Sequence, residues 1–231
     1  MKRCFVISAM LIASVCLAKE SERSFCVNDK GYVTSQPIDH IDSTLTDYIE
    51  RTEVKVTEGH CHYVGEKQIK RFQSIVKQPG VKLIAEIGFN AGHSSEIFLK
   101  TNKNAIVFSF DIMEHPYVLN AKDYIDAKYP DRHFLIPGNS LETVPKFQQK
   151  HPDLKFDVIF IDGGHQFKYA SGDMFNMKEL AHRDTVVLID NLELLGVRKA
   201  FKYACKEGLY RDSRPYTAGK FRWIETKYQL D

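Results

Sequence analysis

The stretch VKLIAEIGFNAGHSSEIFLK, residues 81–100, is the most informative segment of this chain of 231 residues. It opens with the apolar run 81–87, which predicts a buried strand because it is short and ends at a glycine. Residues 88–92 predict a tight turn, and residues 93–100 predict a helix. Glycines in such a turn let a ligand approach the backbone, and free N–H groups line the helix start. The stretch therefore predicts a site that cradles a phosphate or a nucleoside.

This turn differs from the dinucleotide-binding pattern G-x-G-x-x-G. Its sequence is E-I-G-F-N-A-G, so it lacks the third glycine that packs the helix closely in a pyrophosphate loop. Glu86 at the end of the strand would also lie poorly against a phosphate. Both features favour a ligand with a cationic or neutral polar group, and they weaken the alternative that the protein is a nicotinamide-dependent oxidoreductase.

Strands and helices alternate along the rest of the chain. This alternation predicts an α/β fold in which helices cover both faces of a doubly wound, mostly parallel sheet. After the strand at 81–87, further strands are predicted at 105–111, 132–136, 156–162 and 185–190, with two closing β segments at 209–216 and 220–227. Helices are predicted at 41–50, 64–77, 93–100, 117–129, 141–150, 167–181 and 197–207.

Polar residues follow the predicted strands where ligands bind in such folds, beyond the carboxyl ends. Asp111 ends the second strand, where a carboxylate can accept hydrogen bonds from both hydroxyls of a ribose. Asp111 could instead cap a helix or lie on the surface. Ser140 follows the third strand and is a candidate N-cap of the helix at 141–150, with Ser43 or Asp42 as candidate caps of the helix at 41–50.

The fourth and fifth strands end in a possible metal site. Asp162 ends the fourth strand, and Asp190 and Asn191 end the fifth. If these strands are neighbours, two carboxylates and one amide oxygen meet at one rim, and this set suits a hard cation such as Mg²⁺. Without a cation the two carboxylates would repel each other. The alternative is that both aspartates cap the next helices and that Asn191 is a turn residue.

Three motifs carry a resemblance to a known family. The glycine turn at 86–92 resembles the first motif of class I S-adenosylmethionine-dependent methyltransferases. Asp162 with Asp190-Asn191, and the run 64–68 (VGEKQ), resemble catechol O-methyltransferase. The run 162–165 (DGGH) resembles the macrocin-type sugar O-methyltransferases, which pair an aspartate ligand with a histidine base. The chain mixes the two patterns, because His165 replaces the lysine of the catechol enzymes and Asn191 replaces an acid of the macrocin type.

The resemblance covers about residues 64–191 and implies a Rossmann-like sheet of seven strands with an antiparallel closing strand. It implies an O-methyltransferase that uses S-adenosylmethionine and Mg²⁺ or another divalent cation on a hydroxyl of a small molecule. His165 would be the catalytic base, although a helix-start histidine bonded to backbone is an equal alternative. The implied cofactor-binding residues are Val64, Glu86, Gly88, Phe89, Asn90, Gly92, Ser94, Asp111, Ile112, Ser140 and Asp162. The implied metal ligands are Asp162, Asp190 and Asn191.

The first 18 residues have the pattern of a cleaved signal peptide. Lys2 and Arg3 precede an apolar run at 5–17, and small residues end at Ala18. We therefore expect a secreted or lumenal protein without stable membrane insertion, and an uncleaved anchor or a buried helix is the alternative. Residues 19–63 would form an N-terminal extension with a short helix, and residues 64–231 the methyltransferase domain.

Cysteine content and charge add further limits. Three cysteines remain after the signal, and Cys26 and Cys61 could pair in an oxidising compartment. The net charge of +2 is too small to indicate nucleic-acid binding. A homo-oligomer is possible.

Two questions stay open at the level of sequence. Because the cofactor is expected to be scarce outside cells, an exported methyltransferase fold that binds without catalysing is the main alternative function. The methyl acceptor is also open, since phenol, catechol and sugar hydroxyls all suit a metal-assisted base. Leu192, Leu194 and Leu195 could line an acceptor pocket or could pack into the core.

Overall fold

The computed structural model describes residues 25–38, 41, 43–52, 56 and 66–230. Within them, seven strands form one sheet in the order β3-β2-β1-β4-β5-β7-β6. The strands are β1 (Leu83–Ile87), β2 (Ile106–Asp111), β3 (His133–Pro137), β4 (Phe156–Ile161), β5 (Ala181–Ile189), β6 (Tyr210–Ala218) and β7 (Phe221–Tyr228). Strands β1 to β5 pair in parallel, and β7 pairs antiparallel with both β5 and β6. The predicted Rossmann-like sheet with an antiparallel closing strand is confirmed.

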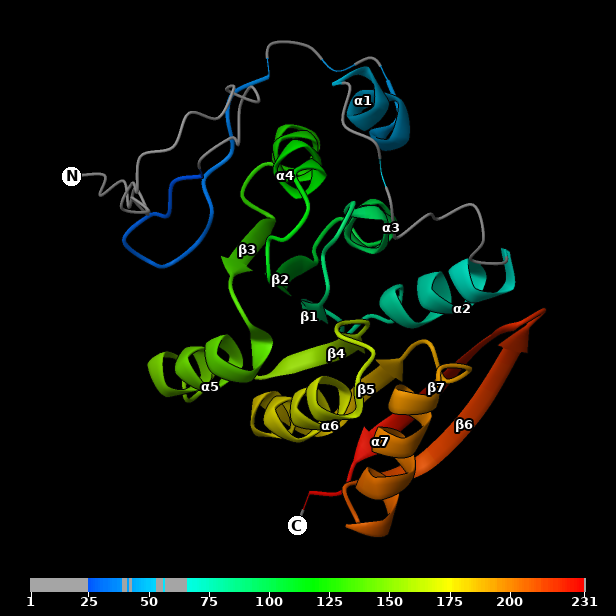
Figure 1. Ribbon diagram of the computed structural model, residues 1–231. Helices are drawn as coiled ribbons and strands as arrows, with labels where there is room; N and C mark the ends of the chain where they lie inside the picture. Colours follow the sequence, from blue (N-terminus) through cyan, green and yellow to red (C-terminus); the bar gives the residue numbers. More distant parts are fainter. Residues whose placement is uncertain (1–24, 39–40, 42, 53–55, 57–65, 231) are drawn as a thin grey trace, which may run out of the picture.

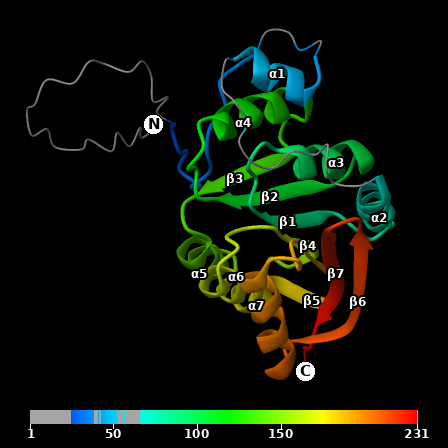
Figure 2. The ribbon, with the colours of Figure 1, turned by 45° about the vertical axis from the view of Figure 1, so that its right-hand side comes forward.

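Helices cover both faces of this sheet (Figure 1). One layer holds α2 (Glu66–Val76), α3 (His93–Thr101) and α4 (Tyr117–Lys128), and α1 (Leu45–Arg51) lies on α4 (Figure 2). The other layer holds α5 (Ser140–Lys150), α6 (Phe167–Asn176), the 3₁₀ helix η2 (Met177–Leu180) and α7 (Leu195–Lys206). Each face of the sheet has its own apolar core, because strands buried on both faces point side chains into both layers.

Parallel pairing carries the ends of β1, β2, β4 and β5 to one edge of the sheet. Ile87 lies opposite Phe110 of β2 on one side and Ile161 of β4 on the other, and Ile161 lies opposite Ile189 of β5. The residues that follow these strands therefore meet at this edge, which is where ligands bind in doubly wound folds.

Three local predictions were wrong. Thr44, rather than Ser43 or Asp42, caps α1, because its hydroxyl accepts the Asp47 N–H while the Asp47 carboxylate accepts the Thr44 N–H. Ser140 is the first residue of α5 and not its cap, since the Asn139 side chain accepts the Leu141 N–H at 3.0 Å. The helix predicted at 167–181 ends at Asn176, where the chain tightens into η2 and then starts β5 at Ala181.

The described part of the N-terminal extension packs into the domain. The Val33 N–H donates to the Leu135 carbonyl oxygen of β3 at 2.8 Å. Val33 is buried in the core of one layer, and Tyr32 in the core of the other, where its ring lies 5.0 Å from that of Phe134. Residues 32–33 therefore pack against the β3 edge of the sheet.

The predicted signal peptide, Val64 and Cys61 lie outside the described residues, so the Cys26–Cys61 pairing stays a prediction. None of the helices in the described ranges combines the length and the apolar character that a membrane span requires.

Candidate active site at the carboxyl edge of the sheet

The glycine turn after β1 is shaped by packing. Gly88 has φ +91°, and a Cβ at this position would overlap the backbone carbonyl oxygen of Asp162. Gly92 has φ +77°, and a Cβ there would lie 3.0 Å from the Phe89 ring. The sequence interpretation assigned these glycines to the approach of a ligand, and the structure adds the close contact of β1 with the end of β4 as a second physical reason.

Glu86 lies inside the sheet rather than at its surface. It is fully buried, and its carboxylate accepts hydrogen bonds from the hydroxyls of Ser94, Ser95 at 2.6 Å and Ser109 at 2.7 Å. Burial raises the pKa of Glu86 to about 7 despite these three donors. Ser94 is the partly exposed member of the cluster, so a cofactor that approaches this corner would meet Ser94 before Glu86. A direct contact between Glu86 and a cofactor stays a prediction.

Asp111 joins the glycine turn to the end of β2. Its two carboxylate oxygens accept the N–H of Asn90 at 2.8 Å and the N–H of Met113 at 2.7 Å. Ile112, beside it, is 61% exposed. The side-chain oxygen of Asn90 is buried without a hydrogen-bond partner in the described chain. A carboxylate, an exposed apolar side chain and an unsatisfied polar atom at one corner fit the ribose and base of a nucleoside.

Two further predicted cofactor residues, Phe89 and Ser140, also follow strand ends at this edge of the sheet. Phe89 turns its ring into the core, where it stacks on His133 at 4.7 Å, so that only its backbone is available to a ligand. Ser140 begins α5 at the same edge of the sheet, after β3. The structure therefore brings the ends of β1 to β4 together as predicted.

Asp162 and Asp190 form an electrostatically coupled pair at the ends of β4 and β5. Burial raises the pKa of Asp162, and the negative charge of Asp190 raises it further. Burial also raises the pKa of Asp190, although the Asn191 N–H at 2.8 Å and the Gln68 amide at 2.9 Å donate to its carboxylate. The negative charge of Glu193 raises the pKa of both aspartates further.

The chemistry of Asp162 and Asp190 suits a bound cation. Two half-buried carboxylates that repel each other would gain stability from a positive ion between them, and hard oxygen ligands suit Mg²⁺. Within the described residues, no group of three or more His, Cys, Asp or Glu side chains could hold a metal ion. A site built on Asp162 and Asp190 would therefore need the amide oxygen of Asn191 as its third protein ligand. With Asn191 included, the two carboxylates and the amide oxygen suit a divalent cation such as Mg²⁺.

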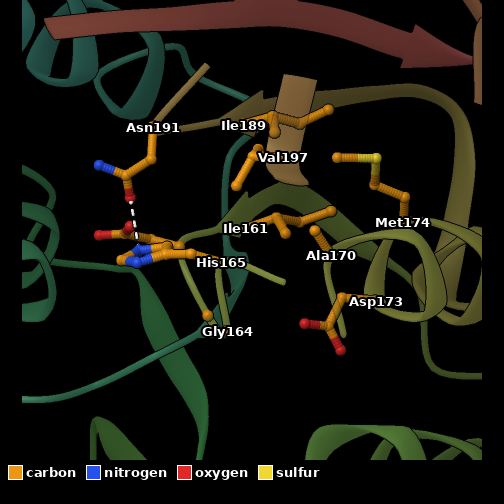
Figure 3. Close-up of a pocket in the computed structure, with 11 residues that line it drawn as sticks. Ile161, Gly164, His165, Ala170, Asp173, Met174, Ile189, Asn191 and Val197 are labelled. Atoms are coloured by element: carbon orange, nitrogen blue, oxygen red, sulfur yellow. Dashed lines mark hydrogen bonds between the residues drawn. The ribbon is translucent and has the colours of Figure 1, made fainter. Parts of the chain in front are cut away.

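His165 is exposed beside the acid pair. Its Nε2 atom lies 3.0 Å from the Asn191 side-chain oxygen (Figure 3). Because an amide oxygen can only accept a hydrogen bond, this contact favours a proton on Nε2, and in the neutral ring Nδ1 then has a lone pair. The start of α7 touches this segment, since a Cβ on Gly196 would overlap the backbone oxygen of His165.

A small pocket of about 10 Å³ lies behind His165, with room for about one water molecule. Figure 3 shows His165 and Asn191 on one side of this pocket and Asp173 and Met174 on the other. Both carboxylate oxygens of Asp173 are buried without a hydrogen-bond partner, and burial raises the pKa of Asp173 to about 6. Ser140 lies close enough to lower this pKa a little, but not in hydrogen-bonding geometry.

Sequence reasoning assigned no role to Gln68, Asp173 or Glu193. Gln68 had a detectable signal, because it lies on the apolar stripe that α2 buries with Phe72 and Ile75. A polar residue on such a stripe needs a hydrogen-bond partner, but the sequence could not identify Asp190 as that partner.

Comparison with known proteins agrees with this fold. Residues 85–192 match a family model described as "Methyltransferase domain". No curated protein sequence matches the chain.

Three solved structures illustrate the likeness of fold. An O-methyltransferase from Bacillus cereus in complex with SAH is 18% identical, with a TM-score of 0.64 over 83% of this chain and 93% of that chain. The O-methyltransferase TomG from Streptomyces achromogenes, in complex with SAM, is 14% identical, with a TM-score of 0.63 over 82% and 92%. The methyltransferase PaMTH1 of Podospora anserina, bound to SAH, is 15% identical, with a TM-score of 0.64 over 82% and 89%. At these identities the likeness establishes the fold.

Proposed function

We propose that the protein is an O-methyltransferase, because residues 85–192 match the methyltransferase-domain family model and the sheet has the Rossmann-like strand order. It would transfer the methyl group of S-adenosylmethionine to a hydroxyl of a small molecule with the help of a divalent cation. The observation that carries the proposal is the placement of Asp162, Asp190, Asn191 and His165 at one edge of the sheet. The O-methyltransferase names of the structural neighbours support the choice of a hydroxyl.

The corner formed by Asp111, Ile112 and the glycine turn would hold the nucleoside part of the cofactor. S-adenosylmethionine, when bound, supplies an electrophilic methyl group on a sulfonium sulfur. Asp162, Asp190 and Asn191 would hold the cation, which lowers the pKa of a hydroxyl that it coordinates. Sites of this kind gain most of their rate from holding the reacting groups in line.

His165 would take the proton of the acceptor hydroxyl. The proton would go to Nδ1, because Nε2 keeps its own proton in the bond to Asn191. The acceptor oxygen would then be the nucleophile toward the methyl group that S-adenosylmethionine supplies, and the cofactor's sulfur would leave as a neutral thioether. Asn191 would thereby fix the tautomer of the base, as oriented partners of catalytic histidines do.

The test is methyl transfer to a panel of hydroxylated compounds, read by mass spectrometry as the gain of one methyl group, with and without EDTA and added Mg²⁺. His165→Gln should lower turnover at least about 100-fold, within the range attributed to general acid–base catalysis. Its S-adenosylmethionine affinity, measured by calorimetry, should stay near that of the wild type. Asp190→Ala should abolish the stimulation by Mg²⁺ and leave cofactor binding largely intact.

His182→Gln is the matched control, because His182 lies at the start of β5, at the opposite edge of the sheet, where it pairs with Asp157 at 3.0 Å. Unchanged turnover in His165→Gln would remove His165 as the base. Cofactor binding without transfer to any acceptor would favour the non-catalytic alternative.

The compartment is a separate part of the proposal. The basic start and apolar run of residues 1–18 support action outside the cell or in the lumen of the secretory pathway. N-terminal sequencing of the mature protein should then begin at Lys19.

A further inference from the structure

Four polar side chains form a row through the sheet behind the glycine turn. Glu86 of β1 accepts the Ser109 hydroxyl of β2 at 2.7 Å, and the Ser109 oxygen lies 3.0 Å from Nε2 of His133 on β3. Asp126 of α4 comes next, with a carboxylate oxygen 3.8 Å from Nδ1 of His133. We call these four residues the polar row. Nδ1 is buried without a hydrogen-bond partner in the described chain, and such an atom calls for an explanation.

The two ends of the polar row face different surroundings. At one end, beside the glycine turn, the hydroxyl of the partly exposed Ser94 donates to Glu86. At the other end, the Asp126 side chain is 24% exposed and pairs with the buried Lys122. The three members before Asp126 are at most 3% exposed. The polar row therefore connects the predicted cofactor corner with the surface of α4.

The hydrogen bonds of the polar row can point in either direction. A hydroxyl both donates and accepts, and a neutral imidazole carries its proton on either nitrogen. When Glu86 is ionised, Ser109 donates to it, and Nε2 of His133 donates to Ser109. When Glu86 is protonated, its O–H donates to Ser109, which in turn donates to Nε2. The imidazole proton then lies on Nδ1, which faces Asp126.

Glu86 can change its protonation near neutral pH while His133 stays neutral. Burial raises the pKa of Glu86 to about 7, although three hydroxyls lower it. Burial lowers the pKa of His133 to about 4. The charged groups of the described residues that act on the row are Asp111 and Asp162 at the Glu86 end and Lys122 and Asp126 at the His133 end.

We propose that the polar row carries the proton of Glu86 to Asp126 when a positively charged cofactor binds beside Ser94. This inference rests on the cofactor of the proposed function and adds how the charge of its site changes on binding. S-adenosylmethionine has an ammonium and a sulfonium group, and a positive charge near a carboxyl group favours the ionised form. The polar row would thereby give the cofactor an ionised partner without leaving a buried proton behind.

The transfer releases one proton in total. The O–H bond of Glu86 breaks as Ser109 takes this proton and gives its own to Nε2 of His133. Nδ1 gives its proton to Asp126, which passes it to water. His133 stays neutral and changes its tautomer. The transfer from Nδ1 needs the two atoms to approach by about 1 Å, which the partly exposed Asp126 side chain can supply.

The tautomer of His133 is the direct readout, since nitrogen NMR of the isotope-labelled protein separates a protonated ring nitrogen from a bare one. In the cofactor-free protein, with EDTA present, Nδ1 should carry the proton at pH 6 and Nε2 at pH 8. With saturating S-adenosylmethionine, Nε2 should carry it at pH 6 as well. His133→Gln assigns the two resonances by their loss. The same tautomer with and without cofactor at pH 6, or a positively charged ring, would overturn the inference.

Two matched variants test the path. Ser109→Ala interrupts the row between Glu86 and His133, so the tautomer should follow neither the pH nor the cofactor. Ser95→Ala is the control, because Ser95 also donates to Glu86, at 2.6 Å, but does not stand between Glu86 and His133. It should keep the change of tautomer. Equal loss of the change in both variants would overturn the polar row as the path.

Calorimetry measures the coupling to Glu86 itself. The affinity for S-adenosylmethionine should be about fivefold higher at pH 7 than at pH 6, because at pH 6 binding must first remove the proton of Glu86. This range keeps the ammonium group of the cofactor charged. Glu86→Gln has no proton to release and should bind equally at both pH values. A fivefold difference that persists in Glu86→Gln would overturn the assignment to Glu86.

The outcomes also separate this inference from the proposed function. A protein that changes the His133 tautomer on binding S-adenosylmethionine but methylates no acceptor supports the inference while the proposed function fails. Methyl transfer without a change of tautomer overturns the inference alone. A protein that binds no S-adenosylmethionine overturns both.

Discussion

At the scale of single residues, the orientation of Asp190 depends on a side chain from a distant helix. The Gln68 amide of α2 donates to one oxygen of Asp190 at 2.9 Å, and the Asn191 N–H donates to the other at 2.8 Å. Each oxygen keeps a lone pair for a further partner. Gln68 is buried on a helix that Phe72 fixes against Phe160 of β4, so its amide holds the carboxylate with little freedom.

Gln68→Met should therefore disturb Asp190 without opening a large cavity, because the two side chains have similar volumes. Losing a hydrogen bond to a charged group costs about 1.5–3 kcal/mol, which corresponds to a loss of turnover of about 10- to 100-fold if the interaction is fully used in the reaction. Binding of Mn²⁺, followed by electron paramagnetic resonance, should weaken, and calorimetry should show unchanged affinity for S-adenosylmethionine. Gln73→Met on the same helix is the control. Equal effects of both substitutions would assign Gln68 a structural role alone.

The buried carboxyl group of Asp173 predicts how the free energy of unfolding depends on pH. Its pKa is about 6 in the folded protein against an ordinary value of 3.8, so the folded state keeps a proton that the unfolded chain releases between these values. The resulting stability is present below about pH 4 and is lost as the pH rises to about 6. Asp173→Asn should therefore be more stable than the wild type by about 1–3 kcal/mol at pH 7, and nearly equal to it at pH 4. Urea unfolding at both pH values checks this, and a difference that does not change with pH would contradict it.

At the scale of elements, the contact between α7 and the segment after β4 sets the place of His165. Gly196 is the second residue of α7, and its backbone lies against that of His165. Helix α6 follows this segment, and the Phe167 ring at its start lies 5.9 Å from that of Tyr203 on α7. The two helices and the loop between β4 and α6 are therefore packed as one unit.

Gly196→Ala should force these elements apart. The added methyl group meets backbone atoms, which yield less easily than a side chain, and overpacking of this kind costs about 1–3 kcal/mol. Thermal unfolding should show the loss, and methyl transfer should fall because His165 shifts. Gly80→Ala is a matched control, since a Cβ at Gly80 meets nothing within 4 Å. If Gly196→Ala and Gly80→Ala have the same unfolding temperature, the close backbone contact at Gly196 does not exclude a larger side chain.

At the scale of the whole molecule, the N-terminal extension and the domain share their cores. Besides Tyr32 and Val33, the Gln36 N–H donates to Asp123 of α4 at 2.7 Å, and Thr52 accepts from Asn120 at 2.8 Å. These contacts cover the β3 edge and the outer side of α4. The described part of the extension therefore packs on the same cores as the domain, and the boundary expected at residue 64 stays a prediction.

Tyr32→Ser should destabilise the entire protein, although Tyr32 is far in sequence from the sheet. Truncation of a large buried aromatic side chain costs about 3–5 kcal/mol, and the ring of Tyr32 packs against Phe108 and Phe134. Chemical denaturation should show a single transition, with its midpoint at a lower denaturant concentration than in the wild type. Tyr32→Phe, which keeps the ring, should stay close to the wild type. An unchanged midpoint in Tyr32→Ser would show that the extension adds nothing to the fold.

Sequence patterns alone predict the order of the elements and the residues at the ends of the strands. Buried parallel strands are short apolar runs, and the chain must turn where glycines and polar residues interrupt them, so both signals are local. Local signals also placed Asp111, Asp162, Asp190 and Asn191 at the sheet edge, where the structure has them.

The hydrogen-bond partners of these residues, by contrast, depend on the three-dimensional packing. Glu86 proved to be enclosed by three serines, Gln68 was joined to Asp190 across 122 positions of sequence, and Leu194 and Leu195 turned outward while Leu192 turned inward. Hydrogen-bond partners and burial depend on the packing of elements far apart in the chain. No periodicity of the sequence encodes that packing, because each contact requires the positions of two elements at once.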